Sequence, residues 1–387
     1  MDIKPDSPKL SVWRAFLVLT VFGIFSLIAG ELGMRLRDWI VNGTPILANP
    51  SYDSVLRMHR YGIWVGRPNA HYRKWHLNAF GFRSEPIALQ KRPGCARVMI
   101  IGASEMFGLY ESPGKDFAAD LTRDLKPSGC FEVLNAAMAG MGIGAAHIYW
   151  SHYLVRFKPD IVLLYPAPDI GLIAYLQTHG HSASARPLPP IQAKSPHSWR
   201  FRSRLLGYLR SFIHMPQFIT NWRTQHTIYA EIHAHPPSWR LHHVPAAVVK
   251  AYATRLNSLV QAIRATGAMP VLMTHALRVT QRDLSSDLSA RLWLLTEGPR
   301  ATAHTWVQND ILSNDQLKAI ARKYHLPVIH LSRELSGCRA CFFDAPHFTN
   351  EGAARAASAA TKELVIVARQ IKDNTAHTGL KSNMPHG

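Results

Sequence analysis

The sequence predicts an α/β protein, in which a three-layer α/β/α domain is built around a parallel five-stranded sheet and follows one N-terminal transmembrane helix. Short runs rich in β-branched and apolar residues recur along the chain, and helix-length segments separate most of them. One long apolar stretch lies near the N-terminus. The five expected strands are Arg97–Gly102, Phe131–Asn135, Asp160–Tyr165, Met269–Thr274 and Pro327–Leu331.

The expected helices of the domain lie between and after these strands. Thr349 and Asn350 are typical residues for a helix start, so they mark the beginning of the last helix. The polar residues 373–387 predict a disordered tail. The expected helices are Lys115–Lys126, Gly144–Phe157, Pro245–Thr266, Ser313–Tyr324 and Glu351–Lys372.

The alternation of strands and helices also predicts the domain organisation. Residues 1–36 form a membrane anchor, 37–93 form a spacer that wraps over the domain, and 94–372 form the domain itself. A stretch at about 175–244 fits no strand–helix unit and is interpreted as an insertion. Within it, Arg200–Ile213 predicts a basic amphipathic helix, which is either a lid, a membrane-facing rim or a solvated cap.

The apolar stretch Ala15–Gly30 contains sixteen uncharged residues and, as a helix, has a length of about 24 Å. Val12 and Trp13 extend it upstream, which brings it close to the ~30 Å of a hydrocarbon core. A cleaved signal peptide is the alternative, but no pair of small residues marks a good cleavage site. We therefore expect an uncleaved single span.

The four cysteines indicate the compartment. Cys95 and Cys130 precede the first two expected strands, so in parallel neighbours they would lie at one sheet edge, within reach of a disulfide. Such a bridge implies an oxidising space, and we expect the domain in the periplasm, at the outer face of a bacterial inner membrane. Cys338 and Cys341 form a C-x-x-C, for which a redox pair, half a zinc site and a local disulfide compete. The lack of a second C-x-x-C favours the local disulfide.

The charge balance predicts a polyanionic neighbour. Lys and Arg number 44 against 25 Asp and Glu, for a net charge of +19. Anionic lipid, acidic glycan and nucleic acid are the candidate polyanions. No helix-turn-helix, zinc-finger or RNP motif is present, so nucleic acid is not an expected partner.

Three residues point to nucleophilic chemistry. Ser104 follows the first expected strand, at the carboxyl end where open α/β sheets place their ligand sites. A serine hydroxyl needs a base to remove its proton, and the base needs an acid to orient it. Asp344 and His347 supply both from one loop before the final helix. The sequence thus predicts a Ser–His–Asp triad.

With these residues the sequence resembles the SGNH/GDSL hydrolase family over roughly Arg97 to Ile371. The first family block corresponds to Gly102-Ala103-Ser104 with Gly108 four residues on, the second to 135–140, and the last to 344–347. Residues 78–83, which we call the approach segment, resemble the stretch that precedes the first block in membrane-anchored members of the family. The resemblance implies the flavodoxin-like SGNH fold.

The resemblance also implies an activity. Ser104, His347 and Asp344 would form the triad of a serine esterase, with the backbone N–H groups of Ser104 and Gly140 as the oxyanion hole and no metal or cofactor. The expected substrate is an O-acyl ester, above all an O-acetyl ester on a cell-envelope or exopolysaccharide glycan. An O-acyltransferase and a catalytically silent glycan-binding or assembly protein are the alternatives. The sequence leaves the oligomeric state open.

Two residues depart from the family pattern. Ala103 replaces the usual aspartate before the nucleophile, and Pro168 replaces the usual oxyanion-hole asparagine. Loss of one such donor costs about 10²–10³ in rate. Asp169 is expected to orient a loop, and His275 is expected to be a satisfied buried histidine rather than a second base. Glu105 either contacts substrate or begins a helix.

Overall fold

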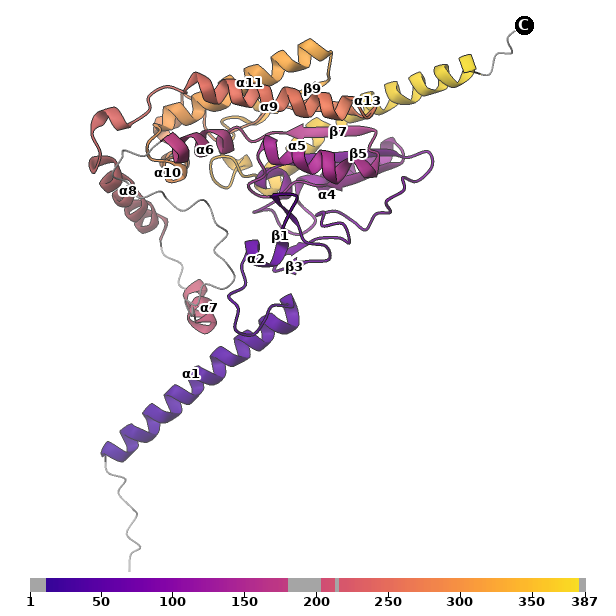
Figure 1. The fold of residues 1–387 in the computed structure, drawn as a ribbon. Helices are drawn as coiled ribbons and strands as arrows, with labels where there is room; N and C mark the ends of the chain where they lie inside the picture. Colours follow the sequence, from indigo (N-terminus) through magenta and orange to yellow (C-terminus); the bar gives the residue numbers. More distant parts are fainter. Residues whose placement is uncertain (1–11, 180–202, 213–215, 383–387) are drawn as a thin grey trace, which may run out of the picture. The chain divides into compact units, whose positions relative to one another are not determined.

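The structure is a computed structural model of the chain and describes residues 12–179, 203–212 and 216–382. The chain divides into two compact units, and Figure 1 labels many of their elements. The first unit combines Met1–Val55 with Ile191–Pro216, and the second combines Leu56–Pro190 with Gln217–Gly387.

The second unit is built on a parallel five-stranded sheet with the order β6-β5-β7-β8-β9. Every neighbouring pair of strands is parallel. Val98, Met99 and Ile100 of β5 are fully buried, as expected for a strand that is covered on both faces. The strands are β5 (Ala96–Gly102), β6 (Phe131–Asn135), β7 (Ile161–Tyr165), β8 (Met269–Met273) and β9 (Val328–Ile329).

Helices cover the sheet in two groups. Helices α4 and α13 pack against each other, whereas α5 and α11 both pack against α9. The predicted three-layer fold class is therefore confirmed. The helices of this unit are α3 (Ser104–Phe107), α4 (Phe117–Leu125), α5 (Ile143–His152), α6 (Asp169–His179), α8 (Gln217–His233), α9 (Ala246–Arg264), α10 (Leu288–Glu297), α11 (Ala303–Tyr324), α12 (Leu331–Leu335) and α13 (Asn350–Ser382). Short 3-10 helices lie at Lys126–Ser128, Leu154–Phe157, Pro237–Trp239, Leu284–Ser286 and Arg339–Cys341.

Two helix ends differ most from the prediction, whereas the expected helix Gly144–Phe157 is divided into α5 and a 3-10 helix. Helix α11 begins three turns before the expected Ser313, because the side chain of Thr302 caps it by accepting a hydrogen bond from the N–H of Thr305. Helix α13 continues through Ser382, so Asp373–Ser382 is helical where a disordered tail was expected, and residues 383–387 lie outside the described residues. No proline follows Asn350 until Pro385, and a helix already formed by packing propagates through polar residues.

Part of the insertion predicted at 175–244 is integrated into the second unit. Helix α8 packs against α10, and its Ile228 is buried in a hydrophobic cluster with Leu176 and Trp306. The expected amphipathic helix at Arg200–Ile213 corresponds to α7 (Arg204–Phe212), which belongs to the first unit. The ends of that expected range lie outside the described residues.

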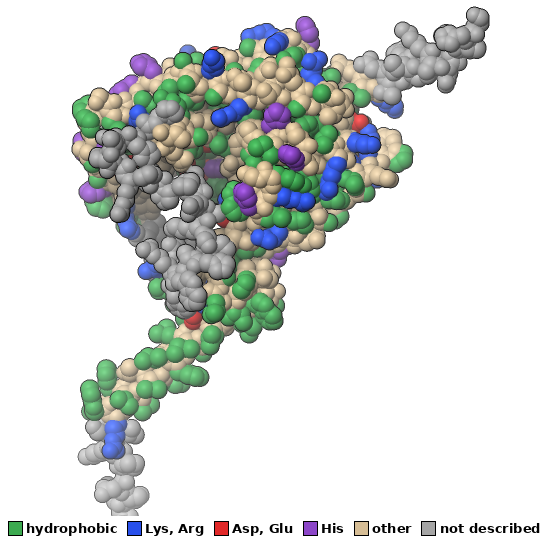
Figure 2. Space-filling model, in the orientation of Figure 1, with side chains coloured by type: hydrophobic (Ala, Val, Ile, Leu, Met, Phe, Trp, Pro, Cys, Tyr) green, Lys and Arg blue, Asp and Glu red, His purple; other side chains and the backbone are tan. Residues whose placement is uncertain are grey.

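The N-terminal region contains more regular structure than the spacer prediction expected. Helix α1 (Val12–Asn42), along which hydrophobic side chains gather (Figure 2), is followed by α2 (Tyr52–Leu56) and two hairpins. Tyr61 and Gly62, both at positive φ, form the two-residue turn of the first hairpin. The hairpin strands are β1 (Arg57–Arg60), β2 (Ile63–Gly66), β3 (His71–Tyr72) and β4 (Trp75–His76).

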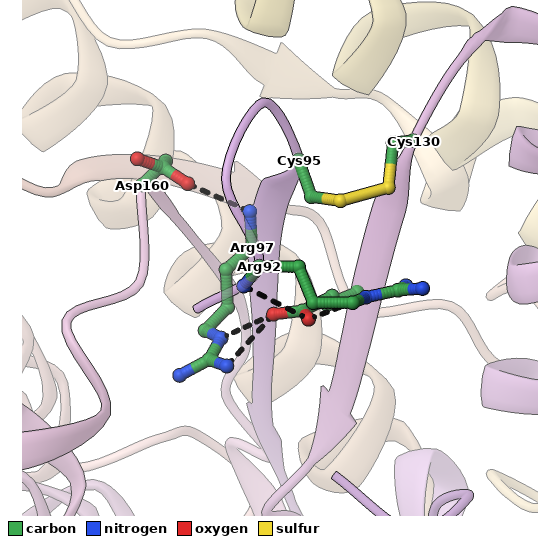
Figure 3. The surroundings of a disulfide bond; sticks show 6 residues. Arg92, Cys95, Arg97, Cys130 and Asp160 are labelled. Atoms are coloured by element: carbon green, nitrogen blue, oxygen red, sulfur yellow. Dashed lines mark hydrogen bonds and ion pairs between the residues drawn. A yellow bond between two sulfur atoms is a disulfide. The ribbon is translucent and has the colours of Figure 1, made fainter. Parts of the chain in front are cut away.

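A buried ion pair and a disulfide join the strands at the amino-terminal edge of the sheet (Figure 3). The guanidinium of Arg97 is fully buried and donates to Glu132, its register partner on β6, at 2.7–2.8 Å. The backbone N–H of Arg97 donates to Asp160, just before β7, at 2.7 Å. Cys95 and Cys130 form a disulfide beside this network, with their Cα atoms 4.5 Å apart. These bonds fix the register of β5, and with it the position of the residues that follow its opposite end.

Candidate active site

The candidate nucleophile lies at a tight strand-to-helix junction. Strand β5 ends at Gly102, and Ser104 begins α3. A Cβ atom on Gly102 would lie 2.7 Å from Cγ of Met106 and 3.0 Å from the carbonyl oxygen of Tyr165, so only glycine fits there. The junction holds Ser104 at the carboxyl end of the sheet.

The end of α3 is held by the approach segment. Gly108 ends α3 at φ +80°, and a Cβ there would lie 2.6 Å from Nη1 of Arg83. Buried Arg83 donates to the carbonyl oxygen of Phe107 at 2.7 Å and pairs with Asp116 at 3.1 Å. Arg83 thus satisfies the end of the helix that Ser104 starts, which gives the predicted approach segment a structural role.

The structure brings Ser104, His347 and Asp344 together. Nε2 of His347 lies 2.9 Å from Oγ of Ser104, and Nδ1 lies 2.7 and 2.8 Å from the two carboxylate oxygens of Asp344. The backbone N–H of His347 also donates to Asp344, at 3.1 Å. Both His347 and Asp344 are buried. The carboxylate therefore orients the imidazole so that its free nitrogen faces the serine hydroxyl.

The surroundings of His347 favour its protonated form. Burial lowers the pKa of His347, but the hydrogen bond and negative charge of Asp344 outweigh burial, and the charges of Glu105 and Asp169 act in the same direction. The net effect is a raised pKa. A raised pKa means that the site stabilises an imidazolium, which is the species that forms when the base accepts a proton from serine.

The second disulfide lies next to the loop that carries Asp344 and His347. Cys338 and Cys341 are bridged, so the C-x-x-C is a local disulfide in this structure. The carbonyl oxygen of Cys341 accepts the N–H of Thr349 at 3.0 Å, which closes the loop at its base. The disulfide thus constrains the chain immediately before the acid and the base.

The loop after β6 contains Gly140, the candidate second donor to an oxyanion. The side chain of Asn135 donates to the carbonyl oxygen of Met106 at 2.8 Å and accepts the N–H of Ala137 at 3.1 Å, so it joins this loop to α3. Gly140 has φ +76°. Within the described residues, the N–H groups of Ser104 and Gly140 donate to no protein acceptor, which leaves both available to a ligand.

Pro168 follows β7 at the place where the family has asparagine. It has no N–H, and its carbonyl oxygen accepts the side-chain amide of Asn309 at 3.0 Å. The next residue, Asp169, begins α6, and its Oδ1 atom is buried without a partner among the described residues. Burial and the nearby charge of Glu105 raise the pKa of Asp169 to about 7.

A row of buried charged side chains begins next to Ser104. The imidazole of His275 lies between Asp310, 2.5 Å from Nδ1, and Glu105, 3.4 Å from Nε2. Although burial lowers the pKa of His275, the two carboxylates raise it to about 10. Burial alone would raise the pKa of Glu105, but His275 and His347 lower it. His275 is therefore a partnered cation, not a free base, and it balances the charge of Glu105 in the first turn of α3.

Aromatic side chains and a carboxylate surround His347. Tyr110 stacks on Phe343 with ring centroids 4.2 Å apart, and both Tyr110 and Trp293 present an edge-on contact to His347, at 5.0 and 5.7 Å. Phe343 is 59% exposed and Tyr110 is 39% exposed. Partial burial of its carboxylate, together with the charge of Asp344, raises the pKa of Glu297, and the charge of His347 opposes the shift. We call Tyr110, Phe343, Trp293 and Glu297 the aromatic rim.

The sequence interpretation missed several of these residues. Asp310 and Asn314 bind His275 from one face of α11. Their i,i+4 spacing was the signal in the sequence that both side chains share one face of a helix. Trp293 and Glu297 lie on α10, which the sequence did not predict, and no local signal connects them with His347.

The described structure thus has a five-stranded parallel sheet with Ser104 at its carboxyl end and His347 and Asp344 in contact with one another beside that serine. Comparison with solved structures matches the chain to a lipolytic protein of the G-D-S-L family from Desulfitobacterium hafniense DCB-2. The identity is 12%, the match covers 69% of this chain and 98% of that chain, and the TM-score is 0.39. A lipase/acylhydrolase from Enterococcus faecalis has 12% identity, coverage of 70% and 95%, and a TM-score of 0.39. A catalytic mutant of an acetylxylan esterase from Geobacillus stearothermophilus has 13% identity, coverage of 69% and 93%, and a TM-score of 0.40. No family model and no curated protein matches the sequence.

Proposed function

We propose that the protein is a serine esterase that hydrolyses O-acyl esters, above all O-acetyl esters on a cell-envelope or exopolysaccharide glycan. The observation that supports it most directly is the 2.9 Å contact between Nε2 of His347 and Oγ of Ser104, with Asp344 bound to the other ring nitrogen. A base and an oriented acid beside a serine hydroxyl are what nucleophilic acyl transfer requires.

The proposed reaction has two halves. Oγ of Ser104 bonds to the ester carbonyl carbon while His347 accepts the hydroxyl proton, and the N–H groups of Ser104 and Gly140 stabilise the oxyanion. His347 then gives the proton to the departing sugar oxygen, which leaves an acyl-serine. Water attacks this ester with His347 again as base, which releases the carboxylic acid and restores Ser104. Asp344 stabilises the imidazolium in both halves.

The aromatic rim supports a glycan as the ester carrier. Exposed aromatic faces suit the apolar C–H surface of a sugar ring, and the carboxylate of Glu297 suits its hydroxyl donors. A cavity of about 600 Å³ lies beside Gly140 and is lined by residues of α6 and α9, among them Ile170 and Val248.

The proposed location is a membrane with the domain on its outer face. Helix α1 is long and apolar enough to span a bilayer, and its apolar residues are exposed along its length. The two disulfides support an oxidising compartment such as the periplasm.

The test is release of acetate from acetylated glycans and of p-nitrophenol from its acetyl ester by the full chain in detergent. Ser104→Ala and His347→Ala should each lower kcat by at least about 10³-fold, whereas Ser151→Ala, an exposed serine on α5, should not. Product that appears only with an added sugar acceptor would replace the esterase with an acyltransferase. Glycan binding without turnover in the wild type would replace it with a binding protein.

A further inference from the structure

Helix α7 is attached by its N-terminus to α1 at the first charged residue after the apolar stretch. The carboxylate of Glu31 accepts hydrogen bonds from Oγ of Ser203 at 2.8 Å and from the backbone N–H groups of Arg204 and Leu205, each at 3.0 Å. These N–H groups have no partner within a helix, so Glu31 supplies the cap that α7 needs. The negative charge also complements the positive end of the α7 dipole.

Two further contacts hold α7 along α1. Nε of Arg204 pairs with buried Asp38 at 2.6 Å, and Asp38 lies two helical turns beyond Glu31 on the same face of α1. Leu205 packs over Gly30, where a Cβ atom would lie 3.0 Å from Cδ2 of Leu205. The missing side chain of Gly30 therefore leaves the space for this close contact.

These attachments determine the level of α7 relative to the apolar part of α1. Val12–Gly30 comprises 19 residues and has a helical length of about 28 Å, which matches the ~30 Å hydrocarbon core. Glu31 follows directly, and Arg35 binds it at 2.7 Å. Helix α7 is thus held where a span formed by α1 would leave the hydrocarbon.

The exposed side of α7 is apolar. Leu206, Tyr208 and Leu209 are 47%, 49% and 49% exposed. At about 100° per residue, these side chains and Leu205 occupy one continuous arc of the helix, with Arg204 on one border and Arg210 on the other. An apolar arc with a cationic border is the pattern of a helix that lies in a membrane interface. Arg204 is held by Asp38, so Arg210 is the arginine that would reach the headgroups while the apolar side chains enter the acyl region.

We propose that α7 is an interfacial helix whose face of Leu206, Tyr208 and Leu209 inserts into the same lipid bilayer that α1 spans. This inference rests on the proposed membrane location of α1 and is independent of the esterase activity. Helix α7 would then act as a second membrane contact, fixed to the anchor by Glu31 and Asp38.

The experiment places an environment-sensitive nitrobenzoxadiazole probe on single cysteines of the full chain in phosphatidylcholine–phosphatidylglycerol vesicles. All four native cysteines are in disulfides, so an introduced cysteine is the only free thiol. Leu209→Cys tests the proposed face, Gly207→Cys on the opposite side of α7 is the matched control, and Phe22→Cys reports insertion of α1. Spin-labelled lipids quench probes in the bilayer, and aqueous iodide quenches probes in water.

The proposal predicts that the probe at position 209 loses most of its fluorescence to spin-labelled lipid and little to iodide, with the reverse at position 207. A probe at 209 that behaves like the one at 207, while the probe at 22 is quenched by lipid, overturns the role of α7. A probe at 22 that iodide quenches shows instead that α1 does not insert, and it overturns the membrane location on which the proposal rests.

Discussion

The carboxylate of Glu105 lies 3.5 Å from the hydroxyl oxygen of Ser104, so the candidate nucleophile has a second acceptor beside His347. A bare buried carboxylate there would oppose the negative charge that develops on the serine oxygen. His275, held by Asp310, supplies the balancing positive charge. The immediate surroundings of Ser104 thus contain two imidazole–carboxylate pairs, one in contact with its hydroxyl and one behind it.

Replacing Glu105 by Gln should move the acid limb of the kcat/KM–pH profile to lower pH. The negative charge of Glu105 raises the pKa of His347, so its removal lets His347 lose its proton at lower pH. Each pKa unit lost also removes about 1.4 kcal/mol of imidazolium stabilisation, and kcat should fall accordingly.

The control for this change is Glu111→Gln. Glu111 is also buried, and burial raises its pKa to about 7, but it is not among the groups that shift His347. The acid limb should therefore keep its position in that variant. An acid limb that keeps its position in Glu105→Gln would show that the charge of Glu105 does not shift the pKa of His347.

The wild-type profile should have its acid limb above the ordinary histidine pKa of 6.5. The reaction needs neutral His347, and a raised pKa means that the neutral fraction grows only as the pH rises through that higher value. Asp344→Asn should shift the limb downward and lower kcat by about 10⁴-fold. Steady-state rates with p-nitrophenyl acetate between pH 5 and 9 measure both effects, and a wild-type limb below the ordinary value would contradict the assigned environment.

The two disulfides should have different effects when they are removed. Replacing Cys95 and Cys130 by Ser opens a loop of 35 residues and should lower the free energy of unfolding by about 3–4 kcal/mol, with kcat unchanged at 25 °C. Replacing Cys338 and Cys341 by Ser should cost less stability but lower kcat, because that bridge precedes the loop of Asp344 and His347. Urea denaturation and esterase assays on both double variants separate the cases. A loss of kcat in the Cys95/Cys130 variant, with the larger loss of stability in the Cys338/Cys341 variant, would contradict both assignments.

Glu132→Ala should destabilise the domain by about 3–5 kcal/mol, because it leaves the fully buried guanidinium of Arg97 without its carboxylate. Asp315→Ala is the matched control, since it breaks an ion pair with Lys318 that is exposed and should cost about 0–1 kcal/mol. Urea midpoints compare the two variants. Equal losses would mean that the Arg97 network does not hold the sheet edge.

Phe343→Ala should raise KM for an acetylated oligosaccharide several-fold and leave kcat/KM for p-nitrophenyl acetate nearly unchanged. The exposed ring of Phe343 stacks on Tyr110 beside His347 and offers a surface that a sugar can contact, whereas the small ester needs only the triad. A matched change at Phe218, an exposed ring on α8, should affect neither substrate. Equal losses on both substrates for Phe343→Ala would assign the residue to loop structure instead of glycan binding.

The sequence by itself determined the fold class and the positions of the sheet strands. Apolar β-branched runs separated by helix-length segments are local patterns, and burial on both faces enforces them, as for Val98 and Ile100. It also led to Ser104, Asp344 and His347 as candidates, because a residue at a strand end and a three-residue loop spacing are local features too. The length of α13 was missed because a helix that is already formed propagates through polar residues when no helix breaker intervenes.

Only the tertiary structure decided which distant groups meet. Ser104 and His347 are 243 positions apart, and the strand order places them 2.9 Å from each other. The pairing of His275 with Glu105 and Asp310, the aromatic rim and the docking of α7 on α1 likewise join segments that share no local pattern. Propensity and periodicity act over a few residues, whereas the charge state of a buried group depends on neighbours that the topology brings to it.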